Sequence, residues 1–213
     1  MSRQAARARG PDRDPERSTV ERILDAAERE FAAIGYAPAR LADIAERAGI
    51  RRPSLLYHFE SKELLYQAVV GRVFDLLGAE LLRSIALAGE FEARLDALVG
   101  AFASFLDARP TLAPIIVREL IDDPEHDDEA HRRGGGPGRA IMLERVAPLL
   151  GTVEDFVREA GSTRVRAGLP IRAAIVQVAG DLLLRSAAGS LRTPLWGPGD
   201  HARQLARHLF LTD

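Results

Sequence analysis

Apolar residues recur every three or four positions along most of the chain, which is the period of a helix with one buried face. After Ser18 they follow at steps of four, four and three, which predicts a helix over residues 18–34 with its inward positions at Ile23, Ala27, Phe31 and Ile34. Ser18 and Glu21 have the spacing of a capping box, and Gly35 stands where helices commonly end. The first segment is therefore a helix with both ends marked.

The same period predicts two short helices next, over residues 41–48 and 52–59. Gly49 ends the first helix, and Ile50 is expected to fill the turn as a buried apolar plug. Pro53 suits the first turn of the second helix, because the N–H that proline lacks has no partner there. Two short helices joined by such a turn are typical of a helix-turn-helix.

The helical pattern continues to the end of the chain, while no strand pair and no internal repeat is found. Six further helices are predicted, beginning near residues 62, 91, 111, 139, 171 and 200. The stretch 122–138, first acidic, then basic, then glycine-rich, predicts a flexible loop. The fold class is therefore all-α with about nine helices: a flexible arm (1–17), a three-helix head (18–62) and a helical body (63–213).

Composition narrows the class of protein further. Apolar residues make up 46% and charged residues 28% of the 213, the mix of an ordinary soluble globular protein. The absence of cysteine excludes disulfides and thiolate metal sites. No stretch approaches the ~18 apolar residues that a membrane span needs, and residues 1–17 lack the apolar block of a secretory signal. A cytoplasmic protein without membrane contact is expected.

The helix over residues 52–59 has one apolar face and one face that suits DNA. The exposed groups expected near its start and along it can reach base edges and phosphates, and they are Arg51, Arg52, Ser54, Tyr57 and His58. Lys62 lies near the positive end of the next helix, where phosphates bind readily. The alternative is a plain helical hairpin with a solvated basic face. The three-helix context favours DNA binding.

Several segments together resemble the TetR family of regulators. They are ILDAA at 23–27, Phe31, Gly35-Tyr36, DIAERAGI at 43–50 and LYHFESKE at 56–63. The resemblance covers roughly residues 18–70. It implies a homodimer with a DNA-binding head and a variable all-helical body that receives a small-molecule effector.

The resemblance also assigns contacts to positions of this chain. Bases would be read from Arg52, Pro53, Ser54, Tyr57 and His58, and phosphates held by Arg40, Lys62 and Thr19. Three positions depart from the family pattern. Arg51 and Ala39 stand where capping serines or threonines are usual, so both helices of the motif lack the usual cap. Leu56 replaces a common tyrosine, which removes one phosphate contact.

The predicted helix over residues 171–188 is apolar nearly all round and therefore needs partners on two sides. One solution is a central helix of a monomer. The other, which paired heads favour, is a four-helix bundle between two copies, formed by Ile175, Val178, Leu182, Leu205 and Leu209.

The resemblance also implies a pocket in the body, and large apolar residues supply candidate walls: Phe74, Phe102, Phe105, Met142 and Phe156. Each of these residues also fits an ordinary core. Walls of this kind favour an apolar or aromatic effector.

Other chemistry has little support in the sequence. The acidic and histidine residues of 122–131 suggest a hard-cation site, but they match no known loop spacing, so no metal and no other cofactor is expected. No nucleophile elbow or phosphate loop indicates an enzyme. The function expected is a repressor released from a palindromic operator by a small molecule. The alternative is a DNA-binding dimer whose body binds a protein.

Overall fold

The computed structural model describes residues 18–121, 138–199 and 201–212. The predicted arm over residues 1–17 and nearly all of the predicted loop over 122–138 lie outside this part. Ten α-helices and one short 3₁₀ segment make up the described residues, where the only β pairing is an isolated bridge between Val165 and Leu211. The all-α class predicted from the hydrophobic period is confirmed.

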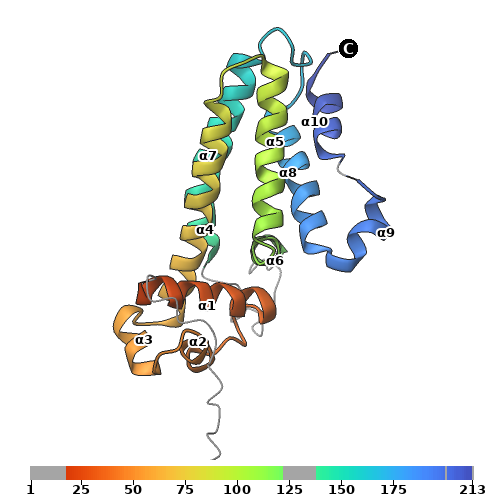
Figure 1. Cartoon of the computed structure of the whole chain (residues 1–213). Helices are drawn as coiled ribbons and strands as arrows, with labels where there is room; N and C mark the ends of the chain where they lie inside the picture. Colours follow the sequence, from red (N-terminus) through yellow and green to blue (C-terminus); the bar gives the residue numbers. More distant parts are fainter. Residues whose placement is uncertain (1–17, 122–137, 200, 213) are drawn as a thin grey trace, which may run out of the picture.

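Three helices form the head at one end of the molecule (Figure 1): α1 (Thr19–Ile34), α2 (Leu41–Arg47) and α3 (Arg52–His58). The body follows with α4 (Lys62–Ile85), α5 (Phe91–Ala108), α6 (Leu112–Ile121), α7 (Gly138–Ala160), α8 (Ile171–Ala187), η3 (Gly189–Leu191), α9 (Arg192–Trp196) and α10 (Ala202–Phe210). Helices α4, α5 and α7 run along the long axis, and α6 lies where the body meets α1.

The helix ends follow the local sequence. Ser18 and Glu21 form the predicted capping box, in which the Glu21 N–H donates to Ser18 Oγ at 3.2 Å and the Ser18 N–H donates to Glu21 Oε2 at 2.8 Å. Helices α2 and α3 have no side-chain cap. Arg51 is the N-cap of α3, as expected, whereas the N-cap of α2 is Arg40 and not Ala39. The segment η3–α9 was not predicted, because eight residues are too short to show a helical period.

The head has a compact core of its own. Ile23, Phe31, Ile44 and Leu55 are each no more than 1% exposed. The ring of Phe31 meets the edge of Tyr66 on α4 at a centroid distance of 4.8 Å. Since α4 also packs along α5 and α7, it joins the head to the body.

Candidate DNA-binding surface and ligand cavity

Helix α3 presents one buried and one exposed face. Leu55 is fully buried in the core of the head, where α3 packs against α2. The other face is exposed and carries Arg51, Arg52, Pro53, Ser54, Tyr57 and His58. Tyr57 is 85% exposed, and its ring lies beside that of His58 at a centroid distance of 5.3 Å. The exposed face therefore combines basic, hydroxyl and aromatic side chains that can reach base edges and phosphates.

The turn between α2 and α3 sets their relative position. Gly49 has φ +70°, in the left-handed region that favours glycine. The N–H of Ile50 donates to the carbonyl of Ala45 at 3.0 Å, and the half-buried Ile50 side chain packs on the core. The turn therefore has the tight geometry expected of a helix-turn-helix.

The residues expected to hold phosphates occupy different settings. Arg40 is exposed at the start of α2. Thr19 is half-buried, and its hydroxyl accepts a hydrogen bond from Arg22 at 3.3 Å. Helix α4 begins at the head with Ser61, whose hydroxyl accepts from the Leu64 N–H at 3.1 Å.

Lys62 does not extend from the surface as the phosphate assignment expected. Its ammonium donates to the carbonyls of Tyr36, Ala37 and Ala39 at 2.9, 2.9 and 3.2 Å, and it lies 4.4 Å from the centre of the Tyr36 ring. Burial lowers the pKa of Lys62 below its ordinary value. All three ammonium protons are thereby used within the head, so the structure corrects the expectation and gives Lys62 the role of holding the α1–α2 loop onto α4.

Helix α6 connects the head with the body. The guanidinium of Arg118 donates to the carbonyls of Phe31 and Ala32, at the end of α1, at 3.0 and 2.8 Å. One residue further, Glu119 accepts a hydrogen bond from the buried Tyr66 hydroxyl at 2.6 Å. Two consecutive residues thus fix α6 to both α1 and α4.

A second polar link lies near the start of α6. Arg72 of α4 forms ion pairs with Asp25 at 2.7 Å and with the buried Glu28 at 2.9 Å, both on α1. The hydroxyl of Thr111 donates to Glu28 at 2.6 Å. Sequence reasoning missed these residues because the partners are more than forty positions apart, and no local period marks them.

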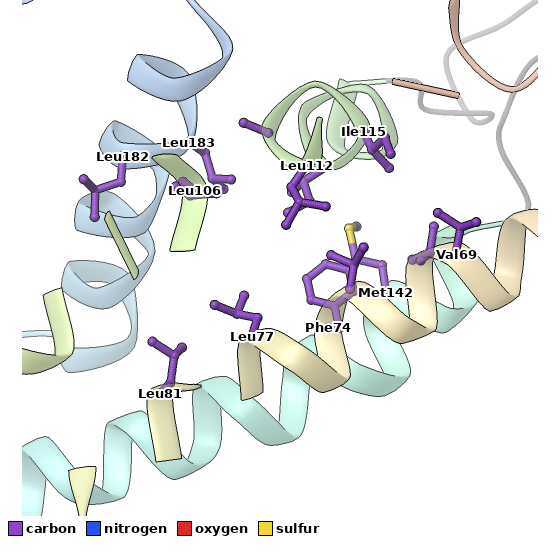
Figure 2. Close-up of a cluster of buried hydrophobic side chains, with 14 of the residues drawn as sticks. Val69, Phe74, Leu77, Leu81, Leu106, Leu112, Ile115, Met142, Leu182 and Leu183 are labelled. Carbon is purple, nitrogen blue, oxygen red and sulfur yellow. The ribbon is translucent and has the colours of Figure 1, made fainter. Parts of the chain in front are cut away.

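The body encloses a cavity of about 320 Å³ between α4, α5, α6, α7 and α8. Figure 2 shows its α4 wall, with Phe74, Leu77 and Leu81, opposite Leu182 and Leu183 of α8. Every residue that lines the cavity is apolar; on α7 these are Met142, Leu143, Val146, Leu149, Leu150, Val153 and Val157. A ligand inside therefore meets no hydrogen-bonding side chain.

Three of the five predicted wall residues line the cavity: Phe74, Phe102 and Met142. Phe156 does not, because it packs on Phe91 at 5.6 Å between ring centroids and lies beneath the guanidinium of Arg94. Phe105 also lies outside, with Arg109 over its ring. The aliphatic walls on α7 and α8 were not anticipated, because in a sequence such residues look like any other core.

The structure also revises the predicted surface between copies. Ile175, Val178 and Leu182 face the interior of their own chain, where each is at most 9% exposed, so they are unavailable to another molecule. Leu205 is 41% exposed and Leu209 is half-buried. On α8 the exposed apolar side chains are instead Val176 and Leu184, about a quarter-turn or more away from the inward face.

Among the described residues, no group of three or more His, Asp or Glu side chains is placed to hold a metal ion. The acidic stretch of 122–131 lies outside the described part of the chain. No helix within that part is long and apolar enough to cross a bilayer.

Together these features define the class: a helix-turn-helix protein with an all-helical body. A family model described as "Bacterial regulatory proteins, tetR family" matches residues 23–69. The transcriptional activator FasR of Mycolicibacterium smegmatis is 38% identical over 85 residues, which cover 40% of this chain and 39% of FasR. The transcriptional regulator RutR of Escherichia coli K12 is 46% identical over 59 residues, or 28% of each chain.

Solved structures extend the likeness to the whole fold. The fatty acid degradation regulator FadR of Bacillus halodurans superposes with a TM-score of 0.69 at 19% identity, covering 95% of this chain and 96% of FadR. FadR of Bacillus subtilis in complex with stearoyl-CoA superposes with a TM-score of 0.64 at 18% identity, covering 89% of this chain and 96% of that protein. SmeT in its complex with triclosan superposes with a TM-score of 0.61 at 23% identity, covering 92% of this chain and 93% of SmeT.

The head of the chain, over residues 23–69, is similar to the TetR family of regulators. The stretch that it shares with the two curated relatives spans well under half of their length, and these relatives are transcriptional regulators, not enzymes. The body is shared only as a fold.

Proposed function

We propose that this protein is a DNA-binding transcription regulator that inserts α3 into the major groove of an operator. The observation that carries the proposal is the outer face of α3, where two arginines, a serine, a tyrosine and a histidine are exposed on a helix whose other face is locked into the head. An α-helix fits the major groove, and arginine binds guanine there through two hydrogen bonds. Exposed Arg40 of α2 then contacts the phosphate backbone.

The regulator acts as a homodimer on a palindromic operator, since two heads reading successive grooves need half-sites ~34 Å apart. The exposed apolar side chains of α8 and the segments after it that lie outside the cavity lining support a surface between two copies; they are Leu184, Leu191, Leu195 and Leu205. Buried against a second copy, they lose their contact with water.

A small apolar molecule in the body cavity controls the affinity for DNA and releases the operator when bound. Helix α6 supports this coupling, because Ile116 and Leu120 line the cavity while Arg118 holds the end of α1. A ligand that displaces α6 therefore displaces the head. If the bound protein blocks transcription from this operator, it is a repressor, and the ligand relieves the repression.

Selection of binding sites from random double-stranded DNA, at one fixed salt concentration, tests the DNA-binding proposal. Enrichment of a palindrome with half-sites one helical turn apart is the expected result. Enrichment of a single half-site contradicts the dimer, and no enrichment by protein that has been unfolded, washed and refolded contradicts sequence reading altogether.

Analytical ultracentrifugation of Leu184→Glu tests the surface between copies. The added charge is expected to dissociate the dimer and to abolish binding to the palindrome, because it lies in the middle of the proposed contact. Leu87→Glu is the matched control: that leucine is equally exposed, but it lies in the loop after α4. Equal behaviour of the two variants would place the contact elsewhere.

A further inference from the structure

The shape and chemistry of the body cavity specify more than an apolar effector. Its α7 wall runs from Met142 to Val157, which at 1.5 Å per residue is about 22 Å of helix. That length is more than twice the diameter of a sphere holding the same 320 Å³. On α4, α5 and α8 the lining spans only about 10–12 Å, so the cavity is extended chiefly along α7.

The walls are also chemically uniform. Phe74, Phe102 and Phe210 are the only aromatic side chains in the lining, and the remainder is aliphatic. No lining residue carries a donor, an acceptor or a charge on its side chain, so a polar group taken inside would lose its hydration without replacement. A flat ligand with several hydroxyl or carbonyl groups does not fit these walls, whereas a hydrocarbon chain does.

The cavity reaches solvent at residues that both line it and are exposed. These are Leu120, Leu143 and Val176, which are 58%, 58% and 50% exposed. Beside Val176 the surface becomes polar, with Gln177 and the ion pair between Arg172 and Glu154 at 2.7 Å. A molecule that is apolar along its length and polar at one end matches this change from cavity to surface.

We propose that the effector is an unbranched alkyl or acyl chain with a single polar head, the chain lying in the cavity and the head remaining in water. A dry cavity of about 150 Å³ holds one benzene, so 320 Å³ holds about twelve carbon atoms. This assignment rests on the proposed function, because it names the ligand of the regulatory cavity.

Calorimetric titration of the DNA-free protein with straight-chain fatty acids of six to sixteen carbons, each below its micelle concentration, tests the chain. Affinity is expected to rise about fourfold for each added methylene and to level off near twelve carbons. Straight-chain alcohols are expected to follow the same series, since the head makes no buried contact. An affinity independent of chain length, or tighter binding of a flat aromatic acid of equal carbon number, would overturn the proposal.

A diacid provides the matched control for orientation. Decanedioic acid has the length of decanoic acid but carries a carboxylate at both ends. With one carboxylate in water beside Val176, the other charge lies inside the cavity. It is expected to bind at least a hundredfold more weakly, because no lining side chain pairs with that charge. Equal binding of the two acids would show that the chain does not enter end-first.

Ala179→Phe links the series to this cavity, because Ala179 lines it and a phenyl ring fills about half of its volume. The plateau is expected to move from about twelve carbons to about six. Ala147→Phe, at an exposed position of α7 outside the lining, is expected to leave it at twelve. An unmoved plateau in a folded Ala179→Phe protein would place the chain elsewhere.

These outcomes are separable from those of the proposed function. If the protein binds the alkyl chain but selects no operator, only the DNA-binding proposal is contradicted. If the protein selects an operator but does not bind the alkyl chain, only the effector assignment is contradicted.

Discussion

The head and the body are both built from amphipathic helices, but they use their apolar surfaces differently. In the head, large side chains from three helices fill the interior, with Ile44 and Leu55 fully buried and Phe31 1% exposed. In the body, five helices leave about 320 Å³ between them unfilled. A close-packed interior holds a reading surface in one shape, whereas an unfilled one leaves room for a ligand to change the packing.

Polar contacts follow the same division. Those that hold the head include five hydrogen bonds to its backbone carbonyls, from Lys62 and from Arg118 of α6, and the ion pairs of Arg72 with Asp25 and Glu28. Those of the body lie mainly on its outer surface, away from the cavity, as between Arg207 and Asp96. The contrast predicts that equal changes have unequal effects in the two regions.

The largest difference is expected when the same side chain is truncated in both. Phe31→Ala removes a fully packed ring from the head and is expected to lower the free energy of unfolding by about 3–5 kcal/mol. Phe102→Ala removes a half-buried ring that already borders the cavity, so about 1–2 kcal/mol is expected. Denaturant titration measures both. Equal losses would show that the cavity wall is packed as tightly as the head.

Lys62→Met retains the alkyl stem but removes the three donors to the α1–α2 loop. The variant is expected to lose about 2–3 kcal/mol of stability, since hydrogen bonds to a charged group are stronger than average. The salt dependence of DNA binding is expected to stay unchanged. A stable variant whose salt dependence is about one unit shallower would restore the phosphate role.

Arg52→Ala tests the reading surface. Binding to the selected operator is expected to weaken by about 1–3 kcal/mol, with relaxed preference at one base pair, measured by fluorescence anisotropy across operator variants. Arg40→Ala is the comparison, because a phosphate contact is expected to weaken binding to all sequences alike and to make the salt dependence shallower. Identical profiles for the two variants would contradict the division between base and phosphate contacts.

Arg118→Ala tests the connection between the two regions. A ligand typically changes DNA affinity through a coupling of ~1–3 kcal/mol, and the variant is expected to lose about 1 kcal/mol of it while ligand affinity without DNA stays the same. Arg118→Lys, which keeps a donor for the Phe31 and Ala32 carbonyls, is expected to retain most of the coupling. Full coupling in Arg118→Ala would show that the signal passes through α4 alone.

The sequence predicts more of the head than of the body, because the features of the head are local and those of the body depend on contacts between distant helices. The head is a local motif: its capping box, its turn glycine and its exposed α3 face are all set within a few residues, so their spacing predicts them. Whether Ile175 faces its own chain or a second copy depends on where distant helices lie, and the sequence period cannot distinguish the two. Lys62 was misplaced because the three carbonyls that bind it come from a loop more than twenty residues earlier.

Lys62 has a further property that follows from the composition of the chain, since it is the single lysine among 29 basic residues. Its amine is held by three backbone carbonyls, so an acylating reagent modifies it only when the loop after α1 detaches from α4. Apart from the α-amino group, Lys62 is then the single amine that reacts, so its rate of acylation measures how often this part of the head opens. Mass spectrometry of the unaltered protein can measure this acylation rate with and without operator DNA, and no mutation is needed to introduce a label.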